Sequence, residues 1–394
     1  MTMRLGRWLR TVFVERNVVL VAAVVFVQSL AENLWTKFVP KYLESLGASA
    51  VVIGLYGTLY DLLDGLYQYP GGWLSDRVGR VRALASSIAV AAAGYVVYAL
   101  APSWELVLLG LTLVMAWHGM ASPSIFAIVG DALPRERRAT AFTVQSLLKR
   151  APLAVGPVIG GWWLAERGVI GGMQLALWCA VALSAVSLLI LRRVRLPAIE
   201  HEPARLAGVF RTFPVPLRRL LLSEIVVRTS EGLVDVFVVV YATTIVGVSA
   251  AEFGVLMTIQ VVTSLAVYVP SARLADRVGR KPLVAATCLA FAGFPLAVVS
   301  SDSFVALAIA FVVGGLREIG EPARKAFIVD LADAGRRGRT VGLYYLIRST
   351  SVAPAAFVGG ALWRVDPALP FYAAAVVGLI GSLTFVVLVR EHES

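Results

Sequence analysis

The chain has 394 residues, of which 58% are apolar and only 15% are charged, and its formal net charge is +11. A soluble globular protein has about a quarter charged residues, because it must cover its surface with polar groups. The composition therefore excludes an ordinary soluble globule and predicts a surface that faces a lipid bilayer. The basic residues lie between apolar runs, without the aromatic-interleaved basic patch that favours nucleic-acid binding, so we expect no nucleic-acid partner.

Twelve apolar segments are long enough for membrane-crossing helices, each of which needs about 20 mostly apolar residues. In chain order they are predicted at 18–43, 50–74, 82–101, 105–133, 139–166, 171–191, 219–245, 250–273, 281–301, 303–331, 338–363 and 368–390. The first segment lacks a small-residue cleavage site and is interpreted as a retained span. The polar stretch 192–218 predicts a cytoplasmic linker between an N-terminal six-helix bundle, 1–191, and a C-terminal one, 219–394.

Arginine and lysine are distributed unevenly over the connections between these segments. If the N-terminus is cytoplasmic, the inner connections hold most of the basic residues. The outer connections and helix ends hold only Lys41, Arg167 and Arg364. This bias fits the positive-inside rule. We therefore expect a multi-pass protein of the plasma membrane with both termini in the cytoplasm.

The chain contains an internal repeat at a constant offset of 200 residues. The matching residues are Gly47, Gly54, Pro70, Asp76, Arg77, Gly79 and Arg80, paired with Gly247, Gly254, Pro270, Asp276, Arg277, Gly279 and Arg280. Further along, PSIFAIVGD ending at Asp131 parallels PARKAFIVD ending at Asp330, and Gly160-Gly161 parallels Gly359-Gly360. The repeat predicts two related six-helix halves, which are typical of secondary transporters with a substrate site near the middle of the membrane.

The stretch after the second segment resembles the signature of the major facilitator superfamily, Gly-x-x-x-Asp-Arg-x-Gly-Arg. The residues that carry this resemblance are Gly72, Asp76, Arg77, Gly79 and Arg80. In the second copy Ala272 replaces the first glycine. The resemblance covers the whole chain and implies an all-α integral membrane fold, with twelve transmembrane helices in two pseudo-symmetric six-helix bundles.

The stretch GPVIGG resembles the fifth-helix motif that is frequent in antiporters of this family. Its motif residues are Gly156, Pro157, Gly160 and Gly161. Pro152 stands where the motif usually has a further glycine. The fourth-helix arginine motif of the family is not recognisable, because Met115 stands near its expected place. The proton-relay role of that arginine is therefore not transferred to this chain.

The repeated decapeptide predicts a cytoplasmic latch. Asp76 is expected just after the end of a helix, in a turn that Gly79 tightens, where its carboxylate can cap a neighbouring helix. Arg77 and Arg80 are expected to reach carboxylates at nearby helix ends. The remaining candidates for the latch are Asp131, Asp276, Arg277, Gly279, Arg280 and Asp330. The alternative is a stable turn that only orients the helices.

Charged residues inside a membrane are costly, so each needs a structural or functional reason. Segments 82–101, 171–191, 281–301 and 368–390 have no internal charge and are expected to face lipid. Arg228, Glu231 and Asp235 are spaced three and four residues apart and so share one helix face. A further cluster comprises Arg317, Glu318, Glu321, Arg324 and Lys325, and its later members are interpreted as part of a cytoplasmic gate.

Several embedded acids are candidates for a proton carrier, which needs a carboxyl group whose protonation changes with its surroundings. They are Glu32, Asp61, Asp64, Glu231 and Asp235. A permanent salt bridge between helices is the alternative role, above all beside Arg228. The candidates for substrate binding are Gln28, Trp35, Tyr60, His118, Lys149, Arg150, Arg228, Arg317 and Arg348. Ordinary helix packing is the alternative for the aromatic residues and for His118.

These features predict a secondary transporter that works by alternating access. The embedded acids, and the lack of a Gly-x-x-x-x-Gly-Lys-[Ser/Thr] nucleotide loop, favour coupling to protons without another cofactor. We expect a monomer that exports a small organic or amphipathic compound. One alternative is proton- or sodium-coupled uptake of an organic anion, for which Lys149, Arg150, Arg228 and Arg348 are suitable ligands.

A non-transporting receptor with the same fold is a further alternative. We do not expect an enzyme, because the sequence has no His-Glu-x-x-His motif and no Ser/His or Asp dyad motif. Cys179 and Cys288 fall inside apolar segments without metal-site spacing, so we expect no metal.

Overall fold

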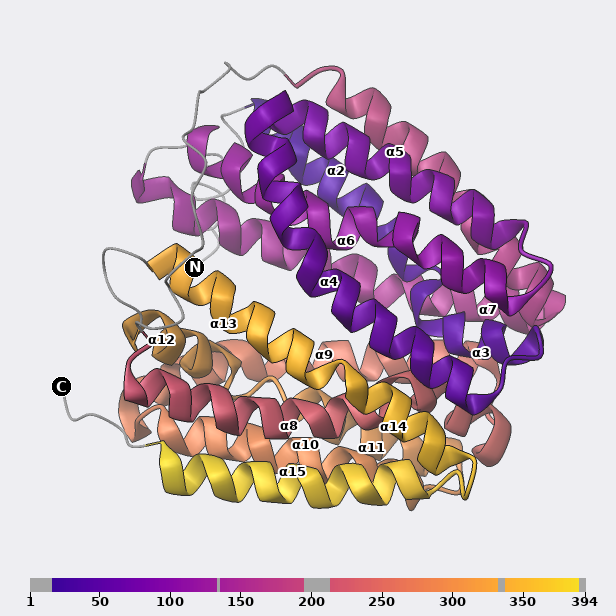
Figure 1. Ribbon diagram of the computed structural model, residues 1–394, viewed down its shortest axis with the longest axis vertical. Coiled ribbons are helices and arrows are strands. Elements are labelled where there is room, and N and C mark those ends of the chain that lie inside the picture. The colour runs from indigo at the N-terminus through magenta and orange to yellow at the C-terminus, as the bar shows by residue number, and fades with distance from the viewer. Residues whose placement is uncertain (1–15, 133–134, 195–212, 332–336, 390–394) are drawn as a thin grey trace. The chain divides into compact units, whose positions relative to one another are not determined.

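The computed structural model describes residues 16–132, 135–194, 213–331 and 337–389, and every regular element in these ranges is helical (Figure 1). The chain divides into two compact units. The first comprises Met1–Val39 and Leu66–Ala204, and the second comprises Pro40–Gly65 and Arg205–Ser394. One long helix, α4 (Ala50–Val78), therefore contributes to both units. The division into 1–191, 192–218 and 219–394 stays a prediction from the repeat.

The first unit is built from long helices that pack along one another. Besides the second part of α4, its elements are α2 (Arg16–Asn33), the short 3-10 helix η1 (Thr36–Phe38), α5 (Arg80–Ala99), α6 (Trp104–Ala132) and α7 (Arg135–Leu191). α2 packs on α7, and α5 packs on both α6 and α7. α7 is interrupted at Gly168, whose φ of 73° and ψ of 166° are not helical. The predicted boundary between segments 139–166 and 171–191 is confirmed there.

The second unit contains the remaining helices. They are α3 (Val39–Ser45), the first part of α4, α8 (Val215–Val240), the π-helix η3 (Tyr241–Val246), α9 (Ala250–Val278), α10 (Lys281–Val299), α11 (Phe304–Leu316), α12 (Glu321–Leu331), α13 (Arg337–Val352), α14 (Pro354–Trp363) and α15 (Leu369–Leu388). α8 packs on α13, α14 and α15, while α10 packs on α11 and α15. A described helix thus lies at each predicted apolar segment.

Seven stretches of the described helices are long and apolar enough to cross a membrane. They are Val19–Ser45, Arg80–Ala99, Trp104–Ala121, Arg150–Leu191, Ala250–Tyr268, Lys281–Val299 and Leu369–Leu388. The predicted segments 50–74, 219–245, 303–331 and 338–363 are not among them, and each of these carries internal charges. A criterion based on apolar composition alone therefore misses the helices that carry several charged residues.

The repeat is visible in the backbone. Gly47 and Gly247 both have a φ of 85°, and Gly79 and Gly279 have φ values of 89° and 86°. Glycine adopts a positive φ readily, whereas a side chain makes this conformation unfavourable. The same backbone turns therefore occur at equivalent places in the two copies, as the offset of 200 residues predicts.

Two equivalent glycines let pairs of helices approach very closely. A Cβ atom at Gly160 in α7 would lie 1.8 Å from the carbonyl oxygen of Leu34, which follows α2. A Cβ atom at Gly359 in α14 would lie 2.1 Å from the carbonyl oxygen of Leu233 in α8. Both contacts use equivalent residues of the two copies. The GPVIGG stretch therefore provides close helix packing, a common role of small residues in membrane helices.

Three predicted segments are each interrupted, so that two helices replace one. α2 ends before α3, α11 ends before α12, and α13 meets α14 at Ala353. At the second break, the backbone N–H of Gly320 donates to Thr287 Oγ1 over 2.6 Å, and Arg317 Nε donates to the Gly314 carbonyl oxygen over 3.0 Å. These bonds satisfy backbone groups that a continuous helix would have paired internally.

We expect Gly160→Ala and Gly359→Ala to lower the stability of the protein, because the added methyl group must push a helix backbone away. Overpacking of this kind costs about 1–3 kcal/mol. The apparent melting temperature of the purified protein in detergent measures the effect.

Gly342→Ala is the matched control. Gly342 lies in α13, and no atom lies within 4 Å of a Cβ built there. This substitution should leave the melting temperature unchanged or raise it, since alanine is favoured over glycine in a helix by about 1 kcal/mol. Equal melting temperatures for the three variants would contradict the close packing at Gly160 and Gly359.

Candidate functional site

α8 supplies the centre of a charged network in the second unit. Its residues Glu224, Arg228 and Glu231 are spaced four and three apart and so lie on one helix face. The other members are Arg317 between α11 and α12, Glu321, Arg324 and Lys325 of α12, and Tyr344 and Arg348 of α13. The network therefore joins α8 to α12 and α13.

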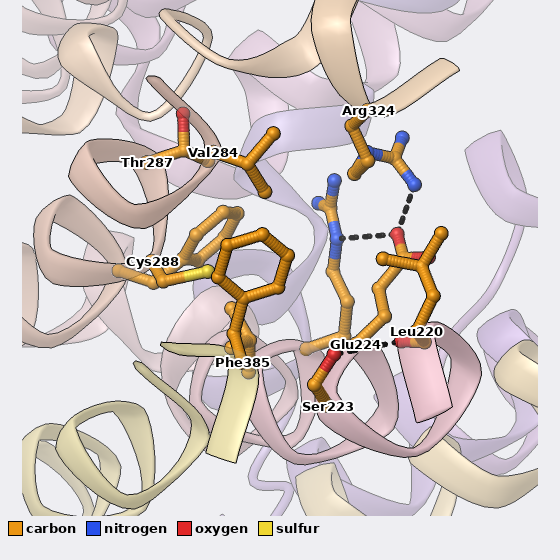
Figure 2. A pocket seen from close by; sticks show the side chains of 11 residues that line it. Leu220, Ser223, Glu224, Val284, Thr287, Cys288, Arg324 and Phe385 are labelled. Carbon is orange, nitrogen blue, oxygen red and sulfur yellow. Dashed lines mark hydrogen bonds and ion pairs between the residues drawn. The ribbon is translucent and has the colours of Figure 1, made fainter. Parts of the chain in front are cut away.

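Glu224 is surrounded by three arginines and a tyrosine. Its buried carboxylate accepts hydrogen bonds from Arg324 Nη1, from the Tyr344 hydroxyl and, over 3.0 Å, from Arg348 Nη1. Arg228 Nε lies 3.9 Å from the same group. Figure 2 shows Glu224 turned towards Arg324. A buried carboxylate is tolerated only where such partners replace the water that it has lost.

Glu231 is held between two other guanidinium groups. Its two oxygens accept hydrogen bonds from Arg228 Nη1 over 2.8 Å and from Arg317 Nη1 over 3.2 Å. Both guanidiniums also lie over the ring of Phe291, 4.8 Å and 5.1 Å from its centroid. Cation–π attraction to one shared ring offsets part of the repulsion between the two positive groups.

Glu321 extends the network along α12. Arg324 donates to both of its oxygens, with Nε at 2.7 Å and Nη2 at 2.5 Å, which is the bidentate geometry of a strong ion pair. Lys325 Nζ lies 3.3 Å from Glu321, and Arg228 Nη2 lies 3.7 Å from it. The ion pairs are therefore continuous, and each arginine in the network has a carboxylate partner. This compensation is the condition for stable buried charge.

A small cavity adjoins the network (Figure 2). Its volume is about 20 Å³, which is room for about one water molecule. Glu224, Arg324 and Thr287 contribute to its polar side, while Cys288 and Phe385 contribute to its apolar side. The cavity is too small for an organic substrate in this conformation.

Asp61 of α4 belongs to the same unit and approaches the network without joining it. It lies within electrostatic range of Asp235, Glu231, Asp64 and Arg348. Neither Asp61 nor Asp235 forms a hydrogen bond or an ion pair with another residue that the structure describes. The structure thus brings together four of the five predicted proton-coupling candidates. Among them, Glu231 is bonded to two arginines, whereas Asp61 and Asp235 have no such bond to a described residue.

The first unit holds a second polar cluster, around Glu32 in α2. The Glu32 carboxylate accepts a hydrogen bond from Trp117 Nε1 over 3.2 Å, and its other oxygen lies 3.0 Å from His118 Nδ1. One turn earlier, buried Gln28 donates to Ser184 Oγ over 3.1 Å. The predicted residues Gln28, Glu32 and His118 therefore lie close together in this unit.

Two aromatic candidates pack against other rings. Trp35 is 1% exposed and meets the rings of Tyr95 and Tyr98 edge-on, at centroid distances of 5.3 Å and 5.6 Å. Tyr60 lies 6.2 Å from Tyr56 on α4. These contacts fit the alternative of helix packing for Trp35, and a role of either residue in substrate binding stays a prediction.

The predicted latch can be followed only in part, because several of its side chains lie outside the described residues. Those side chains are Asp76, Asp131, Asp276 and Asp330, and the substrate candidate Lys149 is also outside. Arg150 is partly buried in α7 of the first unit. The pairing of Arg77 and Arg80 with a carboxylate therefore stays a prediction.

One detail of the predicted latch is wrong. α4 continues to Val78 and α9 continues to Val278, so Asp76 and Asp276 belong to the last turn of each helix and do not follow its end. Pro70 lies inside α4. The positive φ of Gly79 begins the turn to the next helix, as expected.

Glu224 and Tyr344 were not among the predicted site residues. Glu224 lies four residues before Arg228, and this spacing was a signal that could have found it. No sequence pattern around Tyr344 separates it from an ordinary packing tyrosine. Glu321 and Arg324, which the sequence assigned to a gate, are 7% and 6% exposed and belong to the buried network.

Three features are typical of a membrane transporter. They are the glycine turns at equivalent places of the two copies, the interrupted helices and the buried ion pairs. Residues 21–225 and 220–394 match the family model of the Major Facilitator Superfamily. The chain therefore belongs to this superfamily, and is a multi-pass membrane protein of a transporter family.

Its relatives are transporters. The multidrug resistance protein MdtH of Edwardsiella ictaluri is 26% identical over 366 residues, which are 88% of this chain and 87% of the relative. The inner membrane transport protein YajR of Escherichia coli K12 is 28% identical over 143 residues, which are 34% of this chain and 31% of the relative.

Solved structures share the fold at low sequence identity. The nucleoside transporter NupG has a TM-score of 0.79 at 12% identity, covering 95% of this chain and 99% of that chain. The peptide transporter POT in complex with sulfate has a TM-score of 0.76 at 15% identity, covering 95% of this chain and 94% of that chain.

We expect Glu224→Gln to destabilise the protein strongly, because Arg324, Arg348 and Arg228 would lose a shared negative charge in a buried site. Removing one partner from a buried ion pair costs about 3–5 kcal/mol. Thermal unfolding of the purified protein in detergent measures the loss.

Tyr344→Phe is the matched control, since it removes one hydrogen bond to Glu224 and leaves every charge in place. Its expected loss is about 1.5–3 kcal/mol, the range for hydrogen bonds to charged groups. If Glu224→Gln is no less stable than Tyr344→Phe, the arginines do not depend on the Glu224 charge.

Proposed function

We propose that this protein is a proton-coupled exporter of a small organic or amphipathic compound. In this proposal it works as a monomer in the plasma membrane, with both termini in the cytoplasm, and exchanges substrate for protons by alternating access. Export is supported by the MdtH relatives, which are named multidrug resistance proteins and align over most of this chain. The proton is the only cofactor proposed.

The surroundings of Asp61 are the observation that carries the proposal. Three neighbouring acids, Asp235, Glu231 and Asp64, repel a negative charge on Asp61. The basic neighbour, Arg348, is already bonded to another carboxylate. A bound proton neutralises Asp61 and so removes the repulsion. Exposure of Asp61 to water shifts the balance between its protonated and its charged form. Asp61 is therefore the proposed proton carrier.

Glu231 suits a structural role better than a proton-carrying role. Its bonds to Arg228 and Arg317 stabilise the charged form, so loss of that charge would leave two guanidiniums without compensation. Glu32 is the second candidate for the carrier, because its carboxylate lies 3.0 Å from His118 Nδ1, a ring nitrogen with which it can exchange a proton.

Uptake of an organic anion is the less favoured alternative. An anion would need free guanidiniums, and Arg228, Arg317, Arg324 and Arg348 are all bonded to carboxylates. Asp61 and Asp235, which have no bonded partner among the described residues, favour a neutral or cationic compound instead, since their charge repels an anion. Arg150, another predicted anion ligand, lies in α7 of the first unit.

We expect Asp61→Asn to abolish proton-driven accumulation of ethidium, a cationic amphipath, in inverted vesicles with an imposed pH gradient. Exchange of ethidium without a gradient should continue at more than about a third of the original rate and lose its dependence on pH, because the variant cannot release a proton. Ethidium fluorescence measures both activities.

Asp302→Asn is the matched control, because Asp302 is an exposed acid between α10 and α11 and receives the same chemical change. It should transport at the original rate. Accumulation of ethidium by Asp61→Asn against its gradient would rule out Asp61 as the carrier. Binding of ethidium without exchange in the unaltered protein would favour a receptor.

Arg150→Lys and Arg348→Lys separate the two substrate classes. If the substrate is an amphipath, Arg348→Lys should change ethidium affinity less than about threefold and shift its pH dependence, because Arg348 balances buried acid. If the substrate is an anion, either change should lower the affinity for it at least about tenfold, since a hydrogen bond to a charged group contributes about 1.5–3 kcal/mol. Equilibrium binding over a range of pH measures both.

A further inference from the structure

Three helix ends of the second unit meet beside the small cavity. Leu220 of α8, Val284 of α10 and Phe385 of α15 all line it (Figure 2). Leu220 lies in the second turn of α8, Val284 in the first turn of α10 and Phe385 in the last turn of α15. α15 also packs along both other helices (Figure 1). The start of α8, the start of α10 and the end of α15 therefore lie side by side.

These helix ends are basic. Arg218 and Arg219 lie at the start of α8 and are exposed, and neither side chain forms a hydrogen bond or an ion pair with a residue that the structure describes. Lys281 begins α10, and its Nζ donates to the Val386 carbonyl oxygen of α15 over 2.9 Å. α10 and α15 contain no acidic residue. Three positive charges are therefore gathered where the helices meet, on the side that the arginine pattern assigns to the cytoplasm.

An exposed apolar surface continues from the two arginines towards the middle of the helices. Leu222 lies three residues after Arg219 and four after Arg218, so it shares their face of α8, and it is 52% exposed. On α15, which packs beside α8, Leu383 and Val387 are 66% and 72% exposed. Basic side chains at the end of a membrane helix reach the level of the lipid headgroups. The surface therefore matches both the charged and the apolar part of a phospholipid.

We propose that an anionic phospholipid binds here, at a basic lipid site formed by Arg218, Arg219 and Lys281 together with the exposed apolar side chains of α8 and α15. In this site the guanidiniums hold the lipid phosphate, and the acyl chains lie along Leu222 and Leu383. A guanidinium binds a phosphate through two parallel hydrogen bonds, and basic pockets between membrane helices bind anionic headgroups. The lipid thus supplies the negative partner that the described protein does not offer to the two arginines.

The surroundings of the arginines favour a lipid over a soluble anion. Because both guanidiniums are exposed, a soluble anion would have to compete with water and salt for them. The bilayer already holds a phospholipid at this level, so its phosphate meets the guanidiniums at a high effective concentration. Its acyl chains cover Leu222 and Leu383 at the same time. A zwitterionic lipid covers the same apolar side chains but brings no net negative charge.

The basic lipid site is expected to stabilise the second unit. α8 carries the two arginines at its start, and Glu224 of the buried network follows Arg219 by five residues. A ligand that binds only the folded protein raises its stability by mass action. The lipid therefore holds α8 beside α10 and α15, while Glu224 holds α8 to α12 and α13.

The first test measures which lipid lies against α8. Leu222→Cys is introduced into a chain in which Cys179 and Cys288 are replaced by alanine, labelled with bimane and reconstituted in phosphatidylcholine vesicles. A small fraction of the lipid carries a nitroxide on its acyl chain, as phosphatidylglycerol in one sample and phosphatidylcholine in the other. Phosphatidylglycerol is expected to quench the bimane several-fold more strongly. Bimane at Val305→Cys, an exposed position at the other end of the unit, should be quenched equally by both lipids.

Arginine substitutions locate the binding. Arg218→Gln combined with Arg219→Gln should abolish the preference for phosphatidylglycerol at position 222. Arg192→Gln combined with Arg193→Gln is the matched control, because it removes two exposed arginines from the end of α7. Loss of the preference in the first pair alone supports the basic lipid site. A preference that survives in the first pair, or that is lost in both pairs, overturns it.

The second test separates a lipid from a free phosphate group. The melting temperature of the unaltered protein in detergent should rise by several degrees with added phosphatidylglycerol, and should not change with phosphatidylcholine or inorganic phosphate. Arg218→Gln with Arg219→Gln should melt at the original temperature without lipid, since both side chains are exposed, and should show no rise with lipid. An equal rise with inorganic phosphate, or an undiminished rise in the variant, overturns the proposal. Neither test uses transport, so both are independent of the proposed export.

Discussion

A charge that is taken out of water into a membrane protein must be compensated by the protein itself, and the second unit is organised around this requirement. Glu224 lies at its centre, where it holds Arg324, Arg348 and the Tyr344 hydroxyl. These partners come from α12 and α13, so neutralising one carboxylate of α8 also fixes the places of two further helices. The bonds that compensate the Glu224 charge therefore also hold α12 and α13 against α8.

Close contact between helix backbones is a second source of packing, besides the ion pairs. Apolar side chains gain little from leaving lipid for another helix, so helices in a membrane depend on contact at short range. Gly160 and Gly359 make this contact in equivalent places of the two copies, against the carbonyl oxygens of Leu34 and Leu233. The two copies therefore share these close backbone contacts as well as the glycines that permit them.

The features that could be predicted from sequence are those with local causes. Apolar length predicted the helices, and the repeated glycines predicted turns whose positive φ values agree within a few degrees. The partners of Glu224 could not be predicted, because they lie 100, 120 and 124 residues away and no local pattern selects them. The break before α12 was missed for the same reason, since Thr287, which bonds Gly320, belongs to another helix.

The distribution of partners also separates two kinds of buried acid. Glu224, Glu231 and Glu321 are held by arginines and serve the architecture, whereas Asp61 has like-charged neighbours and no bonded partner among the described residues. Asp61 lies four residues after Gly57, about one helical turn along α4. A Cβ at Gly57 would lie 2.7 Å from the Ala356 side chain, in the close contact between α4 and α14. If Asp61 carries the proton, its charge therefore changes about one helical turn away from this contact. In the proposed mechanism, a proton that binds at Asp61 therefore acts beside the contact that holds α4 to α14.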